Sequence, residues 1–443
     1  MLQEAVIERA TPPAGQQTMP DVPAPVGGER PRVVILGAGF GGLNAAMALA
    51  DAPVDITIVD RRNHHLFQPL LYQVATAGLS PAQIATPIRR VLAAQKNVTV
   101  LMETARAIDP KLRTVTTCTR EIDYDYLIVA MGARHAYFGH DEWEKTAPGL
   151  KTIADATDIR ARILTAFEKA EARQDPAGRA ALMTFIVVGG GPTGVEMSGA
   201  IAELARQAIV RDFRNISPET ARIVLVEAGP RLLPSFPETL SAAAARQLEK
   251  IGVEVRLGAS VIACDEGGVT LAGDARIDAA TVLWCAGVMA SPAASWLAVP
   301  SDRAGRVIVN PDLSVPQYPE IFVIGDTAAV LAADGRPVPG VAPAAKQMGR
   351  HAAVAIRSKL AGWPSQPFRY RDFGNLATIG RKAAVADLGR IRLSGFAAWL
   401  LWSLAHLWFL VGYRNRLVVF LDWAFAYIAF ERGARLITER SER

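Results

Sequence analysis

The stretch RVVILGAGFGGL, residues 32–43, decides the fold. A short apolar run leads at once into a glycine-rich turn, and a helical pattern begins at Leu43, which is typical of a buried parallel strand followed by a helix. A second apolar run, VDITIVD, ends at Asp60. This order of strand, turn, helix, strand and acid predicts a nucleotide-binding unit of the Rossmann type.

Each part of this unit has a physical reason. Gly37 makes the tight turn, Gly39 lets the backbone approach a pyrophosphate, and Gly42 lets the helix pack closely against the strand. The start of the helix supplies free N–H donors and a partial positive charge. Asp60 can accept hydrogen bonds from an adenosine ribose, so we expect a dinucleotide here.

The same pattern returns in FIVVGGGPTG, residues 185–194, followed by a helical stretch to about residue 213. A strand then ends at Glu227. A carboxylate at this point binds both ribose hydroxyls and repels a 2′-phosphate, which favours NADH over NADPH. Arg231 follows closely and weakens that preference.

Two nucleotide units in one chain predict a flavin paired with a nicotinamide. Two further strand ends support the flavin: Gly132 in residues 125–134, and Gly325-Asp326 in residues 319–328 before a helical stretch. An aspartate there can bind ribityl hydroxyls. Taken alone, such a pair is also compatible with an ordinary turn and helix cap.

Composition narrows the class of protein. The 443 residues are 50% hydrophobic and 21% charged, which excludes a disordered chain. The net charge of +5 is too small to indicate nucleic-acid binding. Cys118, Cys264 and Cys285 form no C-x-x-C pair, so we expect no metal site, no disulfide framework, and buried or inert thiols.

The two ends of the chain differ from its middle. Residues 1–30 are rich in proline and glycine and predict a flexible leader without a secretory signal, on the cytoplasmic side. Residues 395–413 carry no formal charge, and 417–430 are apolar apart from Asp422. Three interpretations fit: interfacial helices, a membrane span, or a core helix pair. The tryptophans of this end are Trp399, Trp402, Trp408 and Trp423.

Several motifs together resemble a known family. They are VVILGAGFGGL, DRRNHHLFQPLLYQVATAGLSP, VVGGGPTGVE, LWCAGV and FVIGD. The chain resembles the pyridine nucleotide–disulfide reductase superfamily over about residues 31–350, and the run 60–81 with the tryptophan-rich end looks like type II NADH dehydrogenase. The resemblance implies non-covalent FAD in the first unit, NADH in the second, and ubiquinone or menaquinone as electron acceptor.

The resemblance also implies an architecture. The fold class is α/β, with two Rossmann-like dinucleotide-binding domains, one inserted in the other, and C-terminal amphipathic membrane-binding helices. The expected division is a leader (1–30), an FAD-binding part (31–150), an NADH-binding domain (151–302), a second FAD-binding part (303–380) and a membrane-associating segment (381–443). A peripheral (monotopic) homodimer on the cytoplasmic face of the inner membrane is implied.

The resemblance also implies individual site residues, one position at a time. The positions implied for FAD are Gly37, Gly39, Gly42, Asp60, Gly132, Gly325 and Asp326, and those implied for NADH are Gly191, Thr193, Gly194, Glu227 and Gly287. Glu196 matches an acidic residue near nicotinamide and flavin. An acid in the first turn of a helix is also stabilised by the helix dipole without any further function.

The quinone motif of the family, AQxAxQ, corresponds here to residues 342–347. Pro343 replaces the first glutamine, and Gln347 keeps the second. Lys346 and Lys382 are candidates for the quinone side, although surface lysines are common.

The implied reaction is hydride transfer from NADH to flavin, then transfer of two electrons to a quinone, without proton pumping. The alternatives are a sulfide:quinone oxidoreductase, which works through cysteines near the flavin, a soluble ferredoxin-type reductase, and an NADH-binding redox sensor without turnover.

Overall fold

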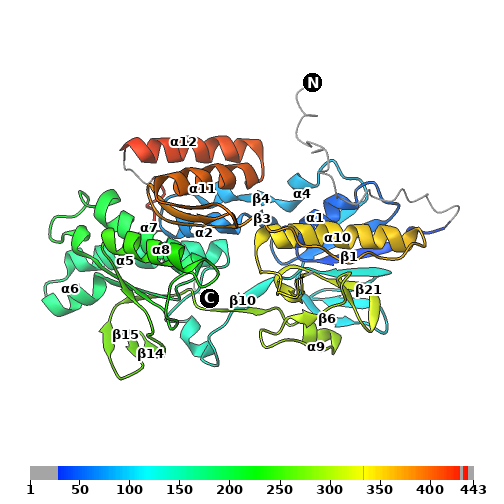
Figure 1. Cartoon of the computed structure of the whole chain (residues 1–443), viewed down its shortest axis with the longest axis horizontal. Coiled ribbons are helices and arrows are strands. Elements are labelled where there is room, and N and C mark those ends of the chain that lie inside the picture. Colours follow the sequence, from blue (N-terminus) through cyan, green and yellow to red (C-terminus); the bar gives the residue numbers. More distant parts are fainter. Residues whose placement is uncertain (1–27, 333, 430–432, 438–443) are drawn as a thin grey trace.

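The computed structural model describes residues 28–332, 334–429 and 433–437. The predicted leader lies outside these residues up to position 27, as do 430–432 and 438–443 of the C-terminal segment. The described chain forms two α/β lobes with a pair of C-terminal helices lying over one of them (Figure 1). The predicted α/β class is confirmed.

A six-stranded sheet forms the core of the first lobe. Its strands, in order across the sheet, are β20 (Ser314–Val315), β21 (Tyr318–Val323), β9 (Tyr126–Val129), β1 (Arg32–Leu36), β2 (Asp55–Asp60) and β5 (Val98–Met102). All pairings are parallel except that of β20 with β21. The apolar run of residues 32–36 is the central strand β1. Because the strands come from residues 32–129 and 314–323, two separate stretches of chain build this lobe.

Two helices pack together on one face of this sheet. They are α1 (Phe40–Ala48) and α10 (Ala342–Leu360), which lie side by side in Figure 1. A Cβ atom added at Gly349 of α10 would overlap the carbonyl oxygen of Gly41 in α1. The absence of a side chain at Gly349 therefore sets how closely the two helices approach, and it holds the start of α10 near the first glycine turn.

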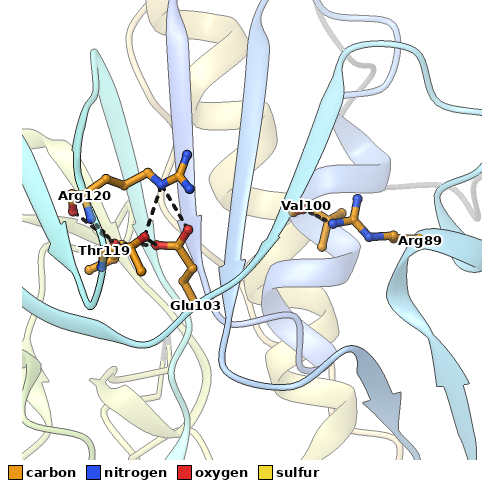
Figure 2. Close-up of polar contacts among 6 residues, drawn as sticks. Arg89, Val100, Glu103, Thr119 and Arg120 are labelled. Atoms are coloured by element: carbon orange, nitrogen blue, oxygen red, sulfur yellow. Dashed lines mark hydrogen bonds and ion pairs between the residues drawn. The ribbon is translucent and has the colours of Figure 1, made fainter.

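Polar contacts hold the region around β5 (Figure 2). The carboxylate of Glu103 accepts a hydrogen bond from the Thr119 hydroxyl at 2.8 Å and pairs with Nε of Arg120 at 3.0 Å. On the other side of β5, Arg89 donates a hydrogen bond to the carbonyl oxygen of Val100 at 2.6 Å. These contacts fasten the segments around residues 89 and 119–120 to β5 and to the residue that follows it. The small sheet beside it comprises β6 (Ala105–Asp109), β7 (Thr114–Thr117) and β8 (Glu121–Asp123).

The second lobe has a four-stranded parallel sheet. Its order is β13 (Val253–Arg256), β12 (Arg222–Val226), β11 (Thr184–Val188) and β17 (Thr281–Trp284). Its helices are α5 (Ile153–Ala172), α6 (Pro176–Leu182), α7 (Pro192–Glu203) and α8 (Glu238–Lys250), and the strands β14 (Val261–Asp265), β15 (Gly268–Leu271) and β16 (Arg276–Asp278) form a small sheet. Helix α9 (Ala293–Leu297) packs instead against β6 in the first lobe. The helical stretch predicted to reach about residue 213 is shorter: α7 ends at Glu203 and a π-helical turn spans Leu204–Ala208.

Two antiparallel strands connect the lobes. They are β10 (Ala133–His135), which leaves the first lobe, and β18 (Val288–Ala290), which leaves the second. The remaining short elements are β3 (His64–Leu66), β4 (Ala85–Pro87), β19 (Val307–Ile308), β22 (Ala328–Ala329), α2 (Leu71–Ala75), α3 (Pro81–Ile84) and α4 (Ile88–Val91).

The C-terminal unit begins earlier than the sequence predicts. Strands β23 (Asn375–Gly380), β24 (Ala383–Asp387) and β25 (Arg392–Ser394) form one antiparallel sheet. The boundary expected between residues 380 and 381 falls inside the β23–β24 turn. Since paired hairpin strands fold as one piece, the unit starts before Asn375.

The apolar C-terminal runs form two helices, α11 (Phe396–Phe409) and α12 (Tyr413–Ala429). One face of α11 packs on β24, with Trp402 only 2% exposed, whereas Leu404 is 58% exposed. Asp422, the charge within the second run, accepts a hydrogen bond from Gln83 of α3. Of the helices in the described residues, none is long and apolar enough to cross a membrane.

Candidate functional site

The first glycine turn forms a cradle that side chains would fill. Gly37 has φ +96°, and a Cβ there would lie 2.5 Å from the carbonyl oxygen of Ala130. A Cβ at Gly42 would overlap the carbonyl oxygen of Gly37, whereas the space around Gly39 is open to 4 Å. The turn is therefore closed toward the protein and open toward the start of α1. Its geometry fits a pyrophosphate, which needs exposed N–H groups at a helix start.

Asp60 is fixed at the end of β2 beside this turn. One carboxylate oxygen accepts a hydrogen bond from the backbone N–H of Ala38 at 2.7 Å, and the other accepts one from the backbone N–H of Arg62 at 2.8 Å. His65 is buried next to it, with Nδ1 3.0 Å from the carbonyl oxygen of Ala38. The run after Asp60 therefore supports the glycine turn through the short strand β3.

The two supporting strand ends meet beside the first turn. Strand β9, which leads to Gly132, lies between β1 and β21, which leads to Gly325. The Thr327 hydroxyl donates a hydrogen bond to the carbonyl oxygen of Gly132 at 3.2 Å. Asp326 lies in the 3₁₀ turn Gly325–Thr327, and no longer helix follows, contrary to the expectation. Asp326 thus stands at the carboxyl edge of the sheet near the first glycine turn.

The second glycine turn repeats the first. A Cβ at Gly189 would lie 2.7 Å from the backbone of Ala286, and one at Gly194 would overlap the carbonyl oxygen of Gly189. Gly191 precedes α7 with open space around it. Thr193 is exposed in the first turn of α7. This turn is therefore also closed toward the protein and open toward a helix start.

Glu227 has the place in the second lobe that Asp60 has in the first. Its two oxygens accept backbone hydrogen bonds from Gly190 at 2.5 Å and from Gly229 at 2.6 Å. Arg231, expected to weaken a preference for NADH, donates instead to the carbonyl oxygens of Phe236 and Pro234 at 3.0 and 2.9 Å. Its guanidinium is engaged by its own loop.

A cavity of about 150 Å³ lies between the second lobe and the C-terminal unit. It is lined by α2, α7, the β23–β24 turn, α11 and α12. Trp399, Trp402 and Trp423 form part of its wall, so we call it the tryptophan cavity. Three of the four tryptophans of the C-terminal end therefore line this cavity, and Trp408 is 64% exposed. Trp423 donates its indole N–H to Gln73 at 2.9 Å.

Glu196 contributes to the wall of the tryptophan cavity from α7. Burial raises its pKa to about 8, and the N–H of Thr378, 3.5 Å from its carboxyl, opposes this shift only weakly. A carboxyl group with that pKa is mostly protonated at neutral pH. It can then donate a hydrogen bond into the cavity as well as accept one.

Lys346 lies in an aromatic setting near the first glycine turn. Its Nζ is 5.2 Å from the ring centre of Phe40 and 5.1 Å from that of Phe409. Burial, with the nearby charges of Arg350 and Arg416, lowers its pKa to about 8. Phe40 starts α1 and Phe409 ends α11, so Lys346 bridges the first lobe and the C-terminal unit.

The other two quinone-side candidates lie elsewhere. Both ends of the Gln347 amide pair with the backbone of Arg371, donating at 3.0 Å and accepting at 2.9 Å, so this amide holds a loop. Lys382 is exposed in the β23–β24 turn with φ +65°. Its neighbours Gly380 and Arg381 line the tryptophan cavity. The structure therefore does not gather Lys346, Gln347 and Lys382 into one cluster.

Sequence reasoning missed the inward face of α11. His406 stacks on Trp402 with ring centres 4.1 Å apart, and burial lowers the pKa of His406 to about 4. Trp399, Trp402 and His406 are spaced three and four residues apart, which places them on one helical face. That spacing predicts a packed helical face. Because the run is long and apolar on all sides, this face does not stand out in the sequence.

Two families match the chain. Residues 31–349 match the pyridine nucleotide-disulphide oxidoreductase family, and residues 373–431 match the NDH2 C-terminal domain. The second match starts two residues before β23 and supports the early start of the C-terminal unit.

Relatives of known name resemble nearly the whole chain. The type II NADH:quinone oxidoreductase NdhA of Mycobacterium tuberculosis is 47% identical over 435 residues, covering 94% of this chain and 91% of the relative. The enzyme Ndh of the same organism is 47% identical over 426 residues, covering 93% and 91%. The structure of NDH2 from Plasmodium falciparum with NADH has a TM-score of 0.83 at 20% identity, covering 93% and 100%. The sulfide:quinone oxidoreductase of Aquifex aeolicus has a TM-score of 0.68 at 20% identity, covering 90% and 95%.

Proposed function

We infer the function from one premise: this chain belongs to the pyridine nucleotide-disulphide oxidoreductase family and, within it, to the type II NADH:quinone oxidoreductases. It transfers a hydride from NADH to FAD and two electrons onward to a quinone. One observation supports this conclusion. Two glycine turns are each closed toward the protein and open toward a helix start, and each has a carboxylate at the end of the next strand.

The first lobe would hold FAD. Gly37, Gly39 and Gly42 would receive the pyrophosphate, Asp60 the adenosine ribose, and Asp326 the ribityl hydroxyls. Gly132 and Gly325 shape the two strand ends beside them. The bound flavin supplies the chemistry of accepting a hydride and releasing electrons. The protein supplies position, because the cradle is formed by backbone that is already fixed in place.

The second lobe would hold NADH. Gly191, Thr193 and Gly194 would receive its pyrophosphate at the start of α7, and Glu227 would accept hydrogen bonds from both adenosine ribose hydroxyls. The two carboxylate oxygens of Glu227 are oriented by backbone N–H groups, and their negative charge would repel a 2′-phosphate. This arrangement supports NADH as the nucleotide.

The quinone would bind at the boundary between the lobes and the C-terminal unit. We assign Glu196 to holding a proton beside the tryptophan cavity and Lys346 to donating from its aromatic setting at the start of α10. Gln347 and Lys382 remain candidates with positioning roles, because the amide of Gln347 supports the loop at Arg371 and Lys382 lies in the turn next to Arg381.

Attachment to a membrane surface is part of the proposal. The outer faces of α11 and α12 expose apolar side chains next to Arg414 and Arg416, a combination that suits an interfacial helix pair near anionic headgroups. A lipid-soluble quinone would then have a short path to the protein. We place the enzyme as a peripheral homodimer on the cytoplasmic face of the inner membrane.

The sulfide:quinone alternative is not favoured. It needs cysteines close together near the flavin, whereas Cys118 follows β7, Cys264 lies in β14, and Cys285 follows β17, in three different sheets. Of the thiols expected to be buried or inert, that of Cys118 is exposed.

The test is spectroscopic. FAD-loaded protein kept without oxygen should lose its flavin absorbance on addition of NADH and regain it on addition of a ubiquinone analogue. Bleaching by sulfide but not by NADH would overturn the proposal. Bleaching by NADH without recovery would instead indicate a redox sensor.

A further inference from the structure

Phe138 is an exposed aromatic residue with an unusual backbone. It follows β10, in the segment that leaves the first lobe, and its side chain is 70% exposed. Its φ of +53° lies in the left-handed region, which bulky residues rarely adopt. Strained residues of this kind concentrate at functional sites. Because the ring is so exposed, its own burial does little to offset the strain.

The ring of Phe138 rests directly on the backbone of Gly287. A Cβ added at Gly287 would lie 2.5 Å from Cζ of Phe138. Gly287 itself has φ +78°. A residue without a side chain at this position is therefore what allows an aromatic ring from the first lobe's exit strand to cover the end of β17.

The end of β17 adjoins the second glycine turn. A Cβ at Gly189 would lie 2.7 Å from the N atom of Ala286, next to Gly287. The sheet order β13-β12-β11-β17 places β12 on one side of β11 and β17 on the other. Ligands of such sheets bind where the strand order reverses, at the carboxyl ends of the strands. Here that point lies between β11 and β17.

The direction of the bound dinucleotide follows from Glu227. Glu227 ends β12 and marks the adenosine side, and the glycine turn after β11 marks the pyrophosphate. The remaining half of the molecule must continue over β17, toward Gly287 and the ring of Phe138. Strand β18 starts at Val288, directly after Gly287. It pairs with β10 and leads toward the flavin lobe.

We propose that Phe138 forms an aromatic wall against which the nicotinamide half of bound NADH packs, and that this contact sets the affinity for NADH. The inference rests on the proposed function, because it assumes that the second lobe takes NADH. Aromatic contacts of this kind change affinity by about 2- to 12-fold. The contact is a binding contact, so its loss should alter nucleotide affinity more than the rate at saturation.

The test compares Phe138→Ala with Phe138→Tyr in the FAD-loaded enzyme. Phe138→Ala should raise the KM for NADH and the Kd for NAD⁺ about 5-fold, within the range for aromatic contacts. The kcat and the KM for a ubiquinone analogue should stay within about 2-fold, since the wall contacts only the nucleotide. Phe138→Tyr, which keeps the ring, should match the parent enzyme.

A second variant makes the test independent of a packing defect. Gly287→Ala should weaken NAD⁺ binding by displacing the ring, and the double variant with Phe138→Ala should lose less than the two single losses together. Unchanged KM and Kd in Phe138→Ala would overturn the inference, as would an equal loss for NADH and quinone with a lower melting temperature. A parent enzyme whose flavin NADH does not bleach would instead overturn the proposed function.

Discussion

The two glycine turns are nearly the same local structure, yet their surroundings differ. In both, one carboxylate oxygen accepts a hydrogen bond from the residue after the first glycine, Ala38 for Asp60 and Gly190 for Glu227. Helix α1 beyond the first turn packs against α10. Helix α7 beyond the second turn instead carries Glu196 to the tryptophan cavity. Two turns of the same local structure therefore lead into helices with different neighbours.

The largest expected effect comes from adding a Cβ atom to one of the two glycine turns at a time. A Cβ at Gly42 or Gly194 overlaps a backbone oxygen that cannot move freely. Overpacking of this kind costs about 1–3 kcal/mol or more. Gly42→Ala should lower FAD affinity more than about tenfold, measured as flavin bound per protein. Gly194→Ala should retain FAD and lose its reduction by NADH.

Gly39→Ala separates folding from binding in this test, because its Cβ would meet the pyrophosphate and no protein atom. Space around Gly39 is open to 4 Å, so the variant should fold with the parent melting temperature. Loss of FAD from Gly194→Ala, with FAD retained in Gly42→Ala, would reverse the assignment of the two cradles.

The choice between NADH and NADPH should depend on the glycine turn of the second lobe alone. Replacing Glu227 by Ala and Ala228 by Arg removes a carboxylate that repels a 2′-phosphate and adds a cation that attracts it. The ratio of kcat/KM for NADPH to that for NADH should rise at least about tenfold, which corresponds to about 1.4 kcal/mol. Asp60→Ala, the corresponding change in the first lobe, should weaken FAD binding and leave this ratio unchanged. An unchanged ratio in the double variant would mean that Glu227 does not contact the ribose.

Helix α7, unlike α1, carries a carboxyl group to the tryptophan cavity. This difference should appear in the pH dependence of stability and of flavin reoxidation. The pKa of Glu196 is raised from 4.5 to about 8, so the folded protein holds a proton that the unfolded chain has lost between those values. Its contribution to stability is therefore fully present below pH 4.5 and is lost as pH rises toward 8. Reoxidation of reduced flavin by a ubiquinone analogue should slow above pH 8 as the carboxyl ionises.

Glu196→Gln should remove both pH effects. The amide stays neutral, so the free energy of unfolding in urea should fall less between pH 5 and 8 than it does in the parent protein. Equal slopes in the two proteins would show that Glu196 does not carry the raised pKa.

The smallest effect on chemistry is expected at the surface of the C-terminal unit. Leu404 and Leu421 are 58% and 55% exposed, so Leu404→Glu with Leu421→Glu should fold normally and sediment less with anionic vesicles. Reduction of the flavin by NADH should remain within about 2-fold, because surface substitutions rarely disturb the core. Unchanged sedimentation would place the attachment elsewhere.

The fold was more predictable than the site. Both parallel strand pairs, β1 with β2 and β11 with β12, lie where the apolar runs predict them. The helical stretch that begins at Pro192 ends with a π-helical turn at Ala208, sooner than the predicted end near residue 213. At the site, Gln347 and Lys346 are adjacent in sequence, but their side chains have different partners, the loop at Arg371 and two aromatic rings.

The sequence by itself determined the two cradles and their acids. Gly42 meets Gly37, Gly194 meets Gly189, and each acid accepts a hydrogen bond from its own glycine turn. These contacts join residues within one strand–turn–helix–strand unit, and glycine spacing fixes them through local sterics. Only the tertiary structure decided that Lys346 lies between Phe40 and Phe409, and that Phe138 covers Gly287. Those contacts join segments far apart in the chain, and their partners are set by how the lobes and the C-terminal unit pack.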